Sequence, residues 1–464
     1  MDKRSEMLGN EKVSKLLIKL SLPATIGMIV NALYNLVDTI FVGRGAGELA
    51  IGGLAIALPI QMVIMAFALT IGIGAASAVS RKLGARELEQ ANLVAGNAFL
   101  AITVLSTLFM ILGLTFTDPL LRLFGASETL LPYAKDYISV IFLGSVFFSF
   151  AVASNNLIRA EGNAKAAMLS MVIGTGLNIL LDPIFIMKEL PINLFIVSFS
   201  IPGLNLGIKG AALATIISQF VSFIYILTYL YGGQSSIKVK PHHLKPDFGL
   251  LWEIFTVGSA SFARQIAGSL VAIILNNSLR IYGGDFSIII FGIVNRLIMF
   301  LFMPLFGVVQ GMQPIAGFNY GAKKIDRVME VVKLSMITTT ILATFGFLIA
   351  QLFPSQIMSI FNTDPDLMND GARVIRIVIS MVPILGIQIV GATLFQSLGK
   401  AVPSLILSLS RQVLFFIPLV LILPRIYGLG LLGIWLTFPA ADLLSTIVTA
   451  ILLRSEIRKL KEEV

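Results

Sequence analysis

Apolar residues run in long blocks along this chain, and short polar or charged segments separate the blocks. A transmembrane helix needs about 20 mostly apolar residues to cross roughly 30 Å of hydrocarbon. Twelve blocks reach that length, and each one predicts a spanning helix. The first six are 15–42, 50–80, 91–116, 130–157, 165–187 and 206–230. The second six are 250–279, 286–314, 328–352, 373–397, 402–423 and 431–453.

The second half of the chain repeats the first half at an offset of 237 residues. Residues 83–89 (LGARELE) align with residues 320–326 (YGAKKID) at that offset. The last span of each half breaks the register, because the LGxxG pattern at 206–210 matches the one at 429–433 at an offset of 223. We therefore expect a longer external loop near 188–205 in the first half.

An internal repeat of six spans has a structural consequence. Six is an even number, so both halves enter the membrane in the same direction. Parallel repeats of this kind are related by a pseudo-two-fold axis along the membrane normal, and in transporters a substrate cavity lies between them. The sequence predicts an all-α integral membrane protein with two six-helix lobes, 1–231 and 250–464, joined by a cytoplasmic linker at 232–249. A duplicated scaffold without a transport role is the alternative.

Composition and charge agree with the bilayer as the solvent. The chain is 56% hydrophobic and 13% charged, whereas a soluble domain carries about 25% charged residues. The net charge of +9 does not indicate a nucleic-acid partner, because the Lys and Arg cluster between apolar blocks. Of the 34 Lys and Arg, 22 fall in one set of alternate connections and nine in the other. This bias predicts that both termini lie in the cytoplasm. We expect a multi-pass protein of the plasma membrane.

Polar side chains at membrane depth are the first candidates for function, because each ionisable one costs roughly 2.5–3.5 kcal/mol on insertion scales. Asn31, Asn35 and Asp38 lie on one stripe of the first span, at i, i+4 and i+7. Asn178 and Asp182 share one face of the fifth span, at i and i+4. By residue count, both carboxylates fall in the outer half of the membrane.

Two acids and several amide oxygens at one depth suit a cation site. Burial and a second nearby carboxylate both favour the protonated form of an acid. Hard oxygen ligands also suit Na⁺, so Asp38, Asn178 and Asp182 form a candidate metal site for that ion alone. In the alternative interpretation, Asp38 lies at a helix end that is hydrated at the outer surface, and the pair Asp182–Pro183 simply terminates its helix.

The second half has a basic bias near mid-membrane. Arg411 and Asp442 lie at similar depths in neighbouring spans, and we expect a structural ion pair because an unpaired buried charge is costly. Arg264 and Arg296 either meet anionic groups of a substrate or satisfy carbonyls at helix ends. Asn155, near the end of the fourth span, either lines a cavity or bonds a neighbouring helix.

Enzyme chemistry is not expected. The chain has no Cys, which excludes disulfides and thiolate metal sites, and its two His are adjacent in a loop. A nucleophile–base pair and a metal-ligand cluster are both missing from the sequence pattern. A Gly-x-x-x-x-Gly-Lys-Ser/Thr loop is also missing, so ATP is not expected as the direct energy source.

Three motifs together resemble the multidrug and toxic compound extrusion (MATE) family. They are NALYNLVDTIFVGR at 31–44, GLNILLDPIFI at 176–186, and VNR at 294–296 followed by QGMQPIAGFNYGA at 310–322. The likeness covers nearly the whole chain. It implies a V-shaped pair of lobes that export cationic or amphipathic drugs in exchange for H⁺ or Na⁺. No other cofactor is implied, and we expect a monomer in the lipid bilayer.

The resemblance also implies roles for individual residues. It assigns cation coupling to Asp38, Asn178, Asp182 and, less directly, Thr215. Candidate cavity residues are Asn31, Tyr34, Asn35, Asn155, Arg264, Gln265 and Arg296. Some relatives use acids in the seventh and tenth spans, where this chain has Gln265, Gln388 and Gln396, so a second cation site of that type is not expected. The alternative function is a lipid-linked oligosaccharide flippase, which needs a large and strongly basic cavity.

Overall fold

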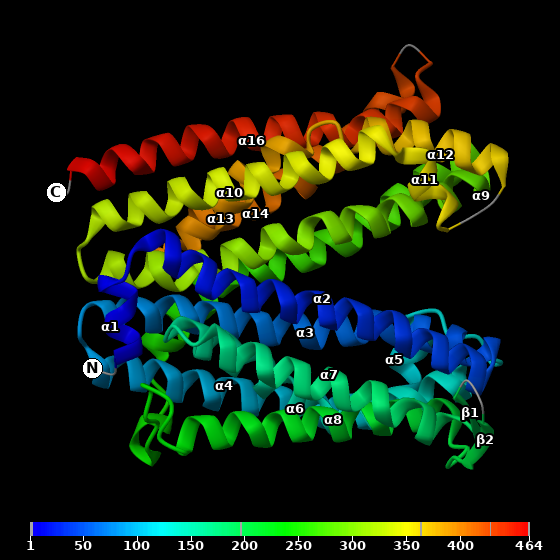
Figure 1. The fold of residues 1–464 in the computed structure, drawn as a ribbon, viewed down its shortest axis with the longest axis horizontal. Coiled ribbons are helices and arrows are strands. Elements are labelled where there is room, and N and C mark those ends of the chain that lie inside the picture. Colours follow the sequence, from blue (N-terminus) through cyan, green and yellow to red (C-terminus); the bar gives the residue numbers. More distant parts are fainter. Residues whose placement is uncertain (1–2, 195–196, 362–363, 427, 463–464) are drawn as a thin grey trace. The chain divides into compact units, whose positions relative to one another are not determined.

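The structure is a computed structural model that describes residues 3–194, 197–361, 364–426 and 428–462 (Figure 1). The first half contains α1 (Lys3–Asn10), α2 (Val13–Ala46), α3 (Glu48–Gly84), α4 (Leu88–Thr115), α5 (Thr117–Leu123), α6 (Leu131–Ala160), α7 (Ala164–Ile186), β1 (Glu189–Leu194), β2 (Val197–Pro202) and α8 (Gly207–Tyr231). After a 3₁₀ turn (Pro241–Leu244) come α9 (Phe248–Gly321), α10 (Ile325–Leu352), α11 (Pro354–Ser359), α12 (Pro365–Val378), α13 (Leu385–Ser397), α14 (Ala401–Leu409), α15 (Ile417–Ile422) and α16 (Gly430–Glu462).

The twelve predicted spans are present. Within the described residues, eleven helical stretches are long and apolar enough to cross a membrane. One of them, α9, has 74 residues and contains two spans, because Gly284 adopts φ 65° and ψ −168° and interrupts the helix. Only glycine takes that conformation without steric cost. The predicted break between residues 279 and 286 is therefore a kink at Gly284 rather than a loop.

Local chemistry sets several helix boundaries. The Asn163 side chain caps α7 by accepting a hydrogen bond from the Ala166 N–H at 3.1 Å, and Asp364 caps α12 in the same manner. The tenth span starts at Pro365, earlier than predicted, and a 3₁₀ turn at Val382–Ile384 breaks it. Pro383 has no backbone N–H to continue the helical ladder.

Two departures from regular α-helix were not predicted. The external loop expected near 188–205 contains the antiparallel hairpin of β1 and β2, in which Glu189 pairs with Pro202. The all-α membrane fold is confirmed, and the hairpin is a local addition within this loop. The eleventh span includes a π-helical segment, Ser410–Phe416, and such segments are frequent at functional sites.

The backbone confirms the internal repeat, because residues in left-handed conformation recur at matched positions of the two halves. Both offsets found in the sequence reappear. The matched pairs are Arg86 (φ 64°) with Lys323 (57°) and Gly162 (91°) with Gly399 (76°) at 237, and Gly207 (54°) with Gly430 (50°) at 223.

The chain packs into two compact units, whose limits differ from those of the repeat. Unit 1 is mainly 26–79 and 88–255, and unit 2 is mainly 5–25, 80–87 and 256–464. In unit 2, Arg327 Nη2 donates to the Glu11 carbonyl at 2.6 Å and Asn319 Nδ2 donates to the Leu8 carbonyl at 2.9 Å. The start of the chain thus packs on the second half. The lobe and linker limits drawn from the sequence (1–231, 232–249 and 250–464) stay predictions.

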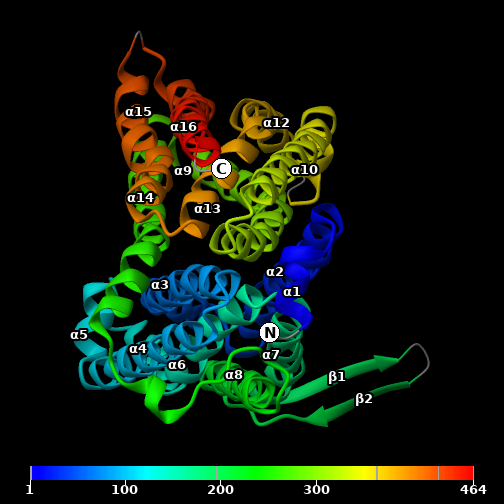
Figure 2. The ribbon, with the colours of Figure 1, turned by 90° about the vertical axis from the view of Figure 1, so that its left-hand side faces the viewer.

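Each unit has its own apolar core. In unit 1, α4, α6, α7 and α8 lie side by side (Figures 1 and 2), and Ile138 and Phe142 of α6 are among the buried side chains. In unit 2, Phe416 meets Phe438 of α16 edge-to-face, with ring centres 4.9 Å apart, beside buried Trp435. Many apolar side chains outside these cores are exposed, as a chain surrounded by lipid requires.

Candidate functional site

The two acids of the first half meet inside unit 1. Asp182 on α7 is completely buried, Asp38 on α2 is 9% exposed, and their carboxyl groups lie within interaction distance. Asn178 Nδ2 donates to Asp182 Oδ1 at 2.7 Å. This contact follows from the i, i+4 spacing, which places both side chains on one face of α7. The structure thus brings together three residues that the sequence singled out for cation binding.

The pair leaves two acceptors unused. Within the described residues, Asp38 Oδ1 and Asp182 Oδ2 are buried and have no hydrogen-bond partner. An ionised carboxylate can only accept, so two such groups in contact need a proton or a cation between them. The arrangement can therefore hold a shared proton or present hard oxygen ligands to Na⁺.

Hydroxyl and amide groups surround the acids. Tyr34 of α2 lies beside the Thr215 hydroxyl and close to Asp38. Thr215 donates to the Ala211 carbonyl at 2.9 Å, which leaves its own oxygen free to accept or to ligate a cation. Of the predicted residues, Tyr34 thus joins the acid cluster, and Thr215 is linked to the cluster through Tyr34.

Two further members of the cluster were not identified from the sequence. Tyr137 of α6 is buried beside Gln61 of α3 and lies near Asp38 and Asp182. Gln61 Nε2 is buried without a partner among the described residues. Gln61 has a long polar side chain in a mostly apolar span, and this signal could have identified it from the sequence. Tyr137 gives no such signal.

Other predicted cavity residues lie apart from the acids or outside the description. Asn155 Oδ1 accepts a hydrogen bond from Ser170 Oγ at 2.6 Å, and this bond links α6 to α7. Ser170 lies about two helical turns, or about 12 Å, from Asn178 along α7. Asn155 therefore forms an interhelical hydrogen bond. Asn31 is half-buried on α2. The side chain of Asn35 lies outside the described residues.

Unit 2 contains the ion pair expected between the eleventh and twelfth spans. Arg411 Nε donates to Asp442 Oδ1 at 2.5 Å, and Asp442 is 1% exposed. The guanidinium also lies 5.6 Å from the centre of the Phe302 ring. Arg411 belongs to the π-helical segment Ser410–Phe416, which packs against α16.

The remaining cavity candidates are all on α9 in unit 2. Arg264 and Gln265 are half-buried before the Gly284 kink, and Arg296 is exposed after it. Arg264 has no ion-pair partner in the part of the chain that the structure describes. All three residues belong to unit 2, whereas the acid cluster is in unit 1.

Comparison with known proteins gives the family. The family model for MatE matches residues 23–184 and 260–422. The chain belongs to the MATE family. The two matched segments of this MATE protein begin 237 residues apart, which is the offset of its internal repeat.

Individual relatives resemble the chain over nearly its full length. The multidrug export protein MepA of Staphylococcus haemolyticus is 25% identical over 417 residues, which are 90% of this chain and 88% of MepA. A MATE crystal structure in complex with MaD3S has a TM-score of 0.91 and 27% identity, with all of both chains covered. A transporter of the MOP superfamily from Pyrococcus furiosus, reported for the reverse polarity of its binding pocket, has a TM-score of 0.90 and 27% identity over 99% of each chain. This MATE protein is thus a multi-pass membrane protein of a transporter family.

Proposed function

We propose that this MATE protein is a secondary antiporter that exports small, drug-like organic compounds in exchange for H⁺ or Na⁺. The observation that supports it most is the buried contact between Asp38 and Asp182, in which one oxygen of each carboxyl group has no hydrogen-bond partner among the residues that the structure describes. The name of MepA, a multidrug export protein, supports the substrate class.

The acid cluster can bind either coupling ion by ordinary chemistry. A proton would sit between the two carboxyl groups and remove the repulsion of two buried charges. Na⁺ would take Asp38 Oδ1 and Asp182 Oδ2, with the Thr215 oxygen as a neutral ligand. Hydrogen bonding from Asn178 orients Asp182 in both cases.

Exchange requires that ion and drug favour different conformations of the protein, because a ligand shifts an equilibrium only through its differential affinity. Helix α2 is suited to this coupling. It carries Asp38 in the cluster and Asn31 and Tyr34 along the same stripe, and Pro23 lies within it. Neutralisation of Asp38 by an ion changes the α2–α7 contact, and the cavity residues on α2 move with it.

We also propose a location, an oligomeric state and an energy source for the antiporter. We propose the plasma membrane as its location, and the Lys and Arg bias favours an orientation with both termini in the cytoplasm. We propose a monomer that uses the ion gradient directly, without ATP. A flippase for lipid-linked oligosaccharides is less well supported, since Asp442 neutralises Arg411 and thereby reduces the basic charge available in unit 2.

Drug efflux from loaded proteoliposomes under imposed H⁺ or Na⁺ gradients tests the proposal. One gradient should drive efflux in the wild type, and Asp38→Asn and Asp182→Asn should each reduce it at least tenfold. Asp370→Asn, an exposed acid, is the matched control and should retain full activity. Gradient-driven efflux that survives both substitutions would rule out coupling at this cluster.

A further inference from the structure

Residues 234–247, which lie within the predicted linker 232–249, are fastened to the rest of unit 1 by hydrogen bonds along their length. At its start, Glu161 at the end of α6 accepts three short hydrogen bonds. The donors are the Tyr229 hydroxyl at 2.6 Å, the Ser235 hydroxyl at 2.8 Å and the Ser236 N–H at 2.7 Å. Glu161 is buried, so water does not compete for these hydrogen bonds, and the carboxyl group anchors the start of the linker.

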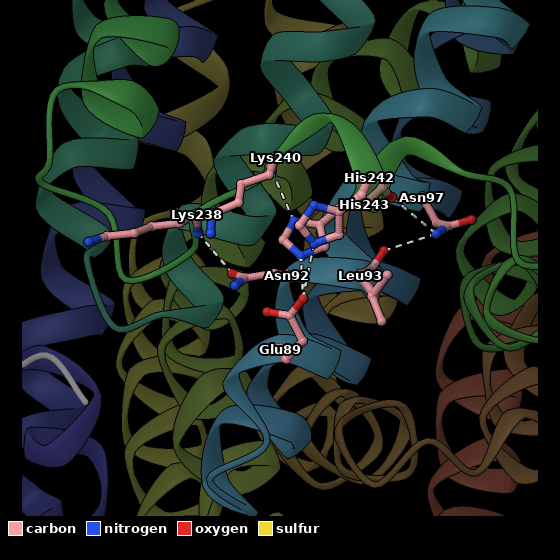
Figure 3. A network of polar contacts seen from close by, with 8 residues as sticks. All are labelled: Glu89, Asn92, Leu93, Asn97, Lys238, Lys240, His242 and His243. Atoms are coloured by element: carbon pink, nitrogen blue, oxygen red, sulfur yellow. Dashed lines mark hydrogen bonds and ion pairs between the residues drawn. The ribbon is translucent and has the colours of Figure 1, made fainter.

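Two asparagines of α4 hold the rest of the linker backbone (Figure 3). Asn92 Oδ1 accepts from the Lys238 N–H at 2.8 Å. Asn97 Oδ1 accepts from the Asp247 N–H at 2.8 Å, and its Nδ2 donates to the Lys245 carbonyl at 3.3 Å. The backbone is thus fixed on α4, while the Lys238 side chain extends away from this network (Figure 3).

Glu89, His242 and His243 form a cluster whose ligand atoms lie within 4.8 Å of one another, as a metal site would require. The hydrogen bonds oppose that interpretation. His243 Nδ1 accepts from the Lys240 N–H at 2.9 Å, so the proton of a neutral ring is on Nε2, which lies 2.8 Å from Glu89 Oε1. That nitrogen has no lone pair for a metal, and a metal-binding His donates from its second nitrogen. The cluster is a further fastening of the linker.

Three lysines stay unpaired on this fixed segment. The side chains of Lys238, Lys240 and Lys245 are exposed, and none of them forms an ion pair with an acid in the described ranges. The acids close by in sequence or space are already engaged. Glu89 binds the two imidazoles, and Asp247 Oδ1 caps the first turn of α9.

Exposed aromatic side chains continue the basic segment into α9. Phe248 is 81% and Trp252 is 73% exposed, and their i, i+4 spacing places them on one face at the start of the span. Trp at such a position is typical of the membrane–water interface. Lys238, Lys240, Lys245, Phe248 and Trp252 together are called the basic–aromatic surface.

We propose that the basic–aromatic surface binds the headgroup of an anionic phospholipid in the leaflet that α9 enters. Lysine ammonium groups donate charge-assisted hydrogen bonds to a phosphodiester, and each lysine near an anionic surface adds attraction. The two aromatic rings lie against the lipid at headgroup level. Because the linker is already fixed on α4, lipid binding orders only the lysine side chains. This inference is independent of the coupling ion and of the drug.

The chain offers a built-in probe of this surface. Its two tryptophans are Trp252, which is exposed, and Trp435, which is buried in the core of unit 2. The Trp435→Phe variant of the full chain is reconstituted in phosphatidylcholine vesicles that contain either brominated phosphatidylglycerol or brominated phosphatidylcholine at equal mole fraction. We expect stronger quenching of Trp252 by the anionic lipid, equivalent to at least about fivefold local enrichment.

Matched charge variants decide whether these lysines cause the preference. In the Trp435→Phe background, both brominated lipids should quench Trp252 equally when the linker lysines are replaced together (Lys238→Gln/Lys240→Gln/Lys245→Gln). Lys165→Gln/Lys333→Gln/Lys459→Gln removes the same charge from other exposed positions predicted to be cytoplasmic, and it should keep the preference. Lys238→Gln alone should show a partial loss, which guards against misfolding of the triple variant.

Three results would overturn the proposal. Both brominated lipids could quench Trp252 equally in the Trp435→Phe parent. The control triple variant could lose the preference as fully as the linker variant, which would indicate net charge alone. Millimolar glycerol phosphate could displace the brominated anionic lipid, which would indicate a site for a soluble phosphate compound.

Discussion

Asp182 illustrates how single side chains are placed in this protein. Its spacing from Asn178 fixes one hydrogen bond on the same helix, and tertiary packing brings Asp38 of α2 against its other side. The first contact could be predicted from the sequence, because i, i+4 neighbours always share a face. The contact with Asp38 rested on equal depth alone, and Gln61 and Tyr137 joined the cluster through packing that no local pattern encodes.

Removal of the Asn178 amide should weaken the cluster without removing a charge. In Asn178→Leu, Asp182 Oδ1 loses its donor while it stays buried. We expect a loss of about 1–3 kcal/mol in the free energy of unfolding. The ion concentration for half-maximal transport should rise as well, because Asp182 is no longer oriented. Thermal unfolding and ion titration of transport measure the two effects, and a variant unchanged in both would contradict the described role of Asn178.

The ion pair in unit 2 should behave as a structural unit. In Asp442→Leu, Arg411 lacks its partner in the bundle, and we expect a loss of about 3 kcal/mol in the free energy of unfolding. Arg411→Met/Asp442→Leu should recover most of the loss, since two apolar groups replace the pair. Glu128→Gln, which breaks the exposed pair with Arg122, should change little. If the double variant is less stable than Asp442→Leu, the pair has a further role, such as binding a substrate group.

At the scale of elements, the sequence predicted the twelve spans well because their length and apolar character are local properties. It failed where neighbours or single residues changed the helix type. The tenth span contains a 3₁₀ turn at Pro383, the eleventh span contains a π-helical segment around Arg411, and strands β1 and β2 pair in the first half's external loop. The packing of residues 5–25 with unit 2 is a tertiary property that apolar blocks do not reveal.

The linker anchor at Glu161 should make stability depend on pH. Burial raises the pKa of the Glu161 carboxyl group. Above about pH 4.5, the Glu161 carboxyl group loses its proton in the unfolded chain but still keeps it in the folded chain. The free energy of unfolding therefore falls as pH rises from there through the raised folded pKa, by at most about 1.4 kcal/mol per pH unit. Unfolding of the wild type and Glu161→Gln between pH 4.5 and 7 measures this term. Parallel pH profiles for the two proteins would contradict it.

At the scale of the whole molecule, the duplicated fold and the site have different symmetry. Left-handed residues recur at the same offsets in both halves, so the scaffold is repeated closely. The chemistry is not repeated, because unit 1 holds the contact between the buried acids Asp38 and Asp182, whereas unit 2 holds an internally neutralised ion pair and Arg264, which has no ion-pair partner among the described residues. Ion coupling is therefore expected to reside in unit 1 alone.

Reciprocity gives the most direct test of the coupling. If ion and drug exchange through one cycle, an outward drug gradient must drive ion uptake even when no ion gradient is imposed. We would measure drug-driven H⁺ or Na⁺ uptake into proteoliposomes for the wild type, Asp38→Asn, Asp182→Asn and Asp370→Asn. The account predicts uptake of one ion by the wild type and Asp370→Asn and none by the other two variants. Drug movement without ion uptake in the wild type, or uptake that persists in Asp38→Asn and Asp182→Asn, would contradict it.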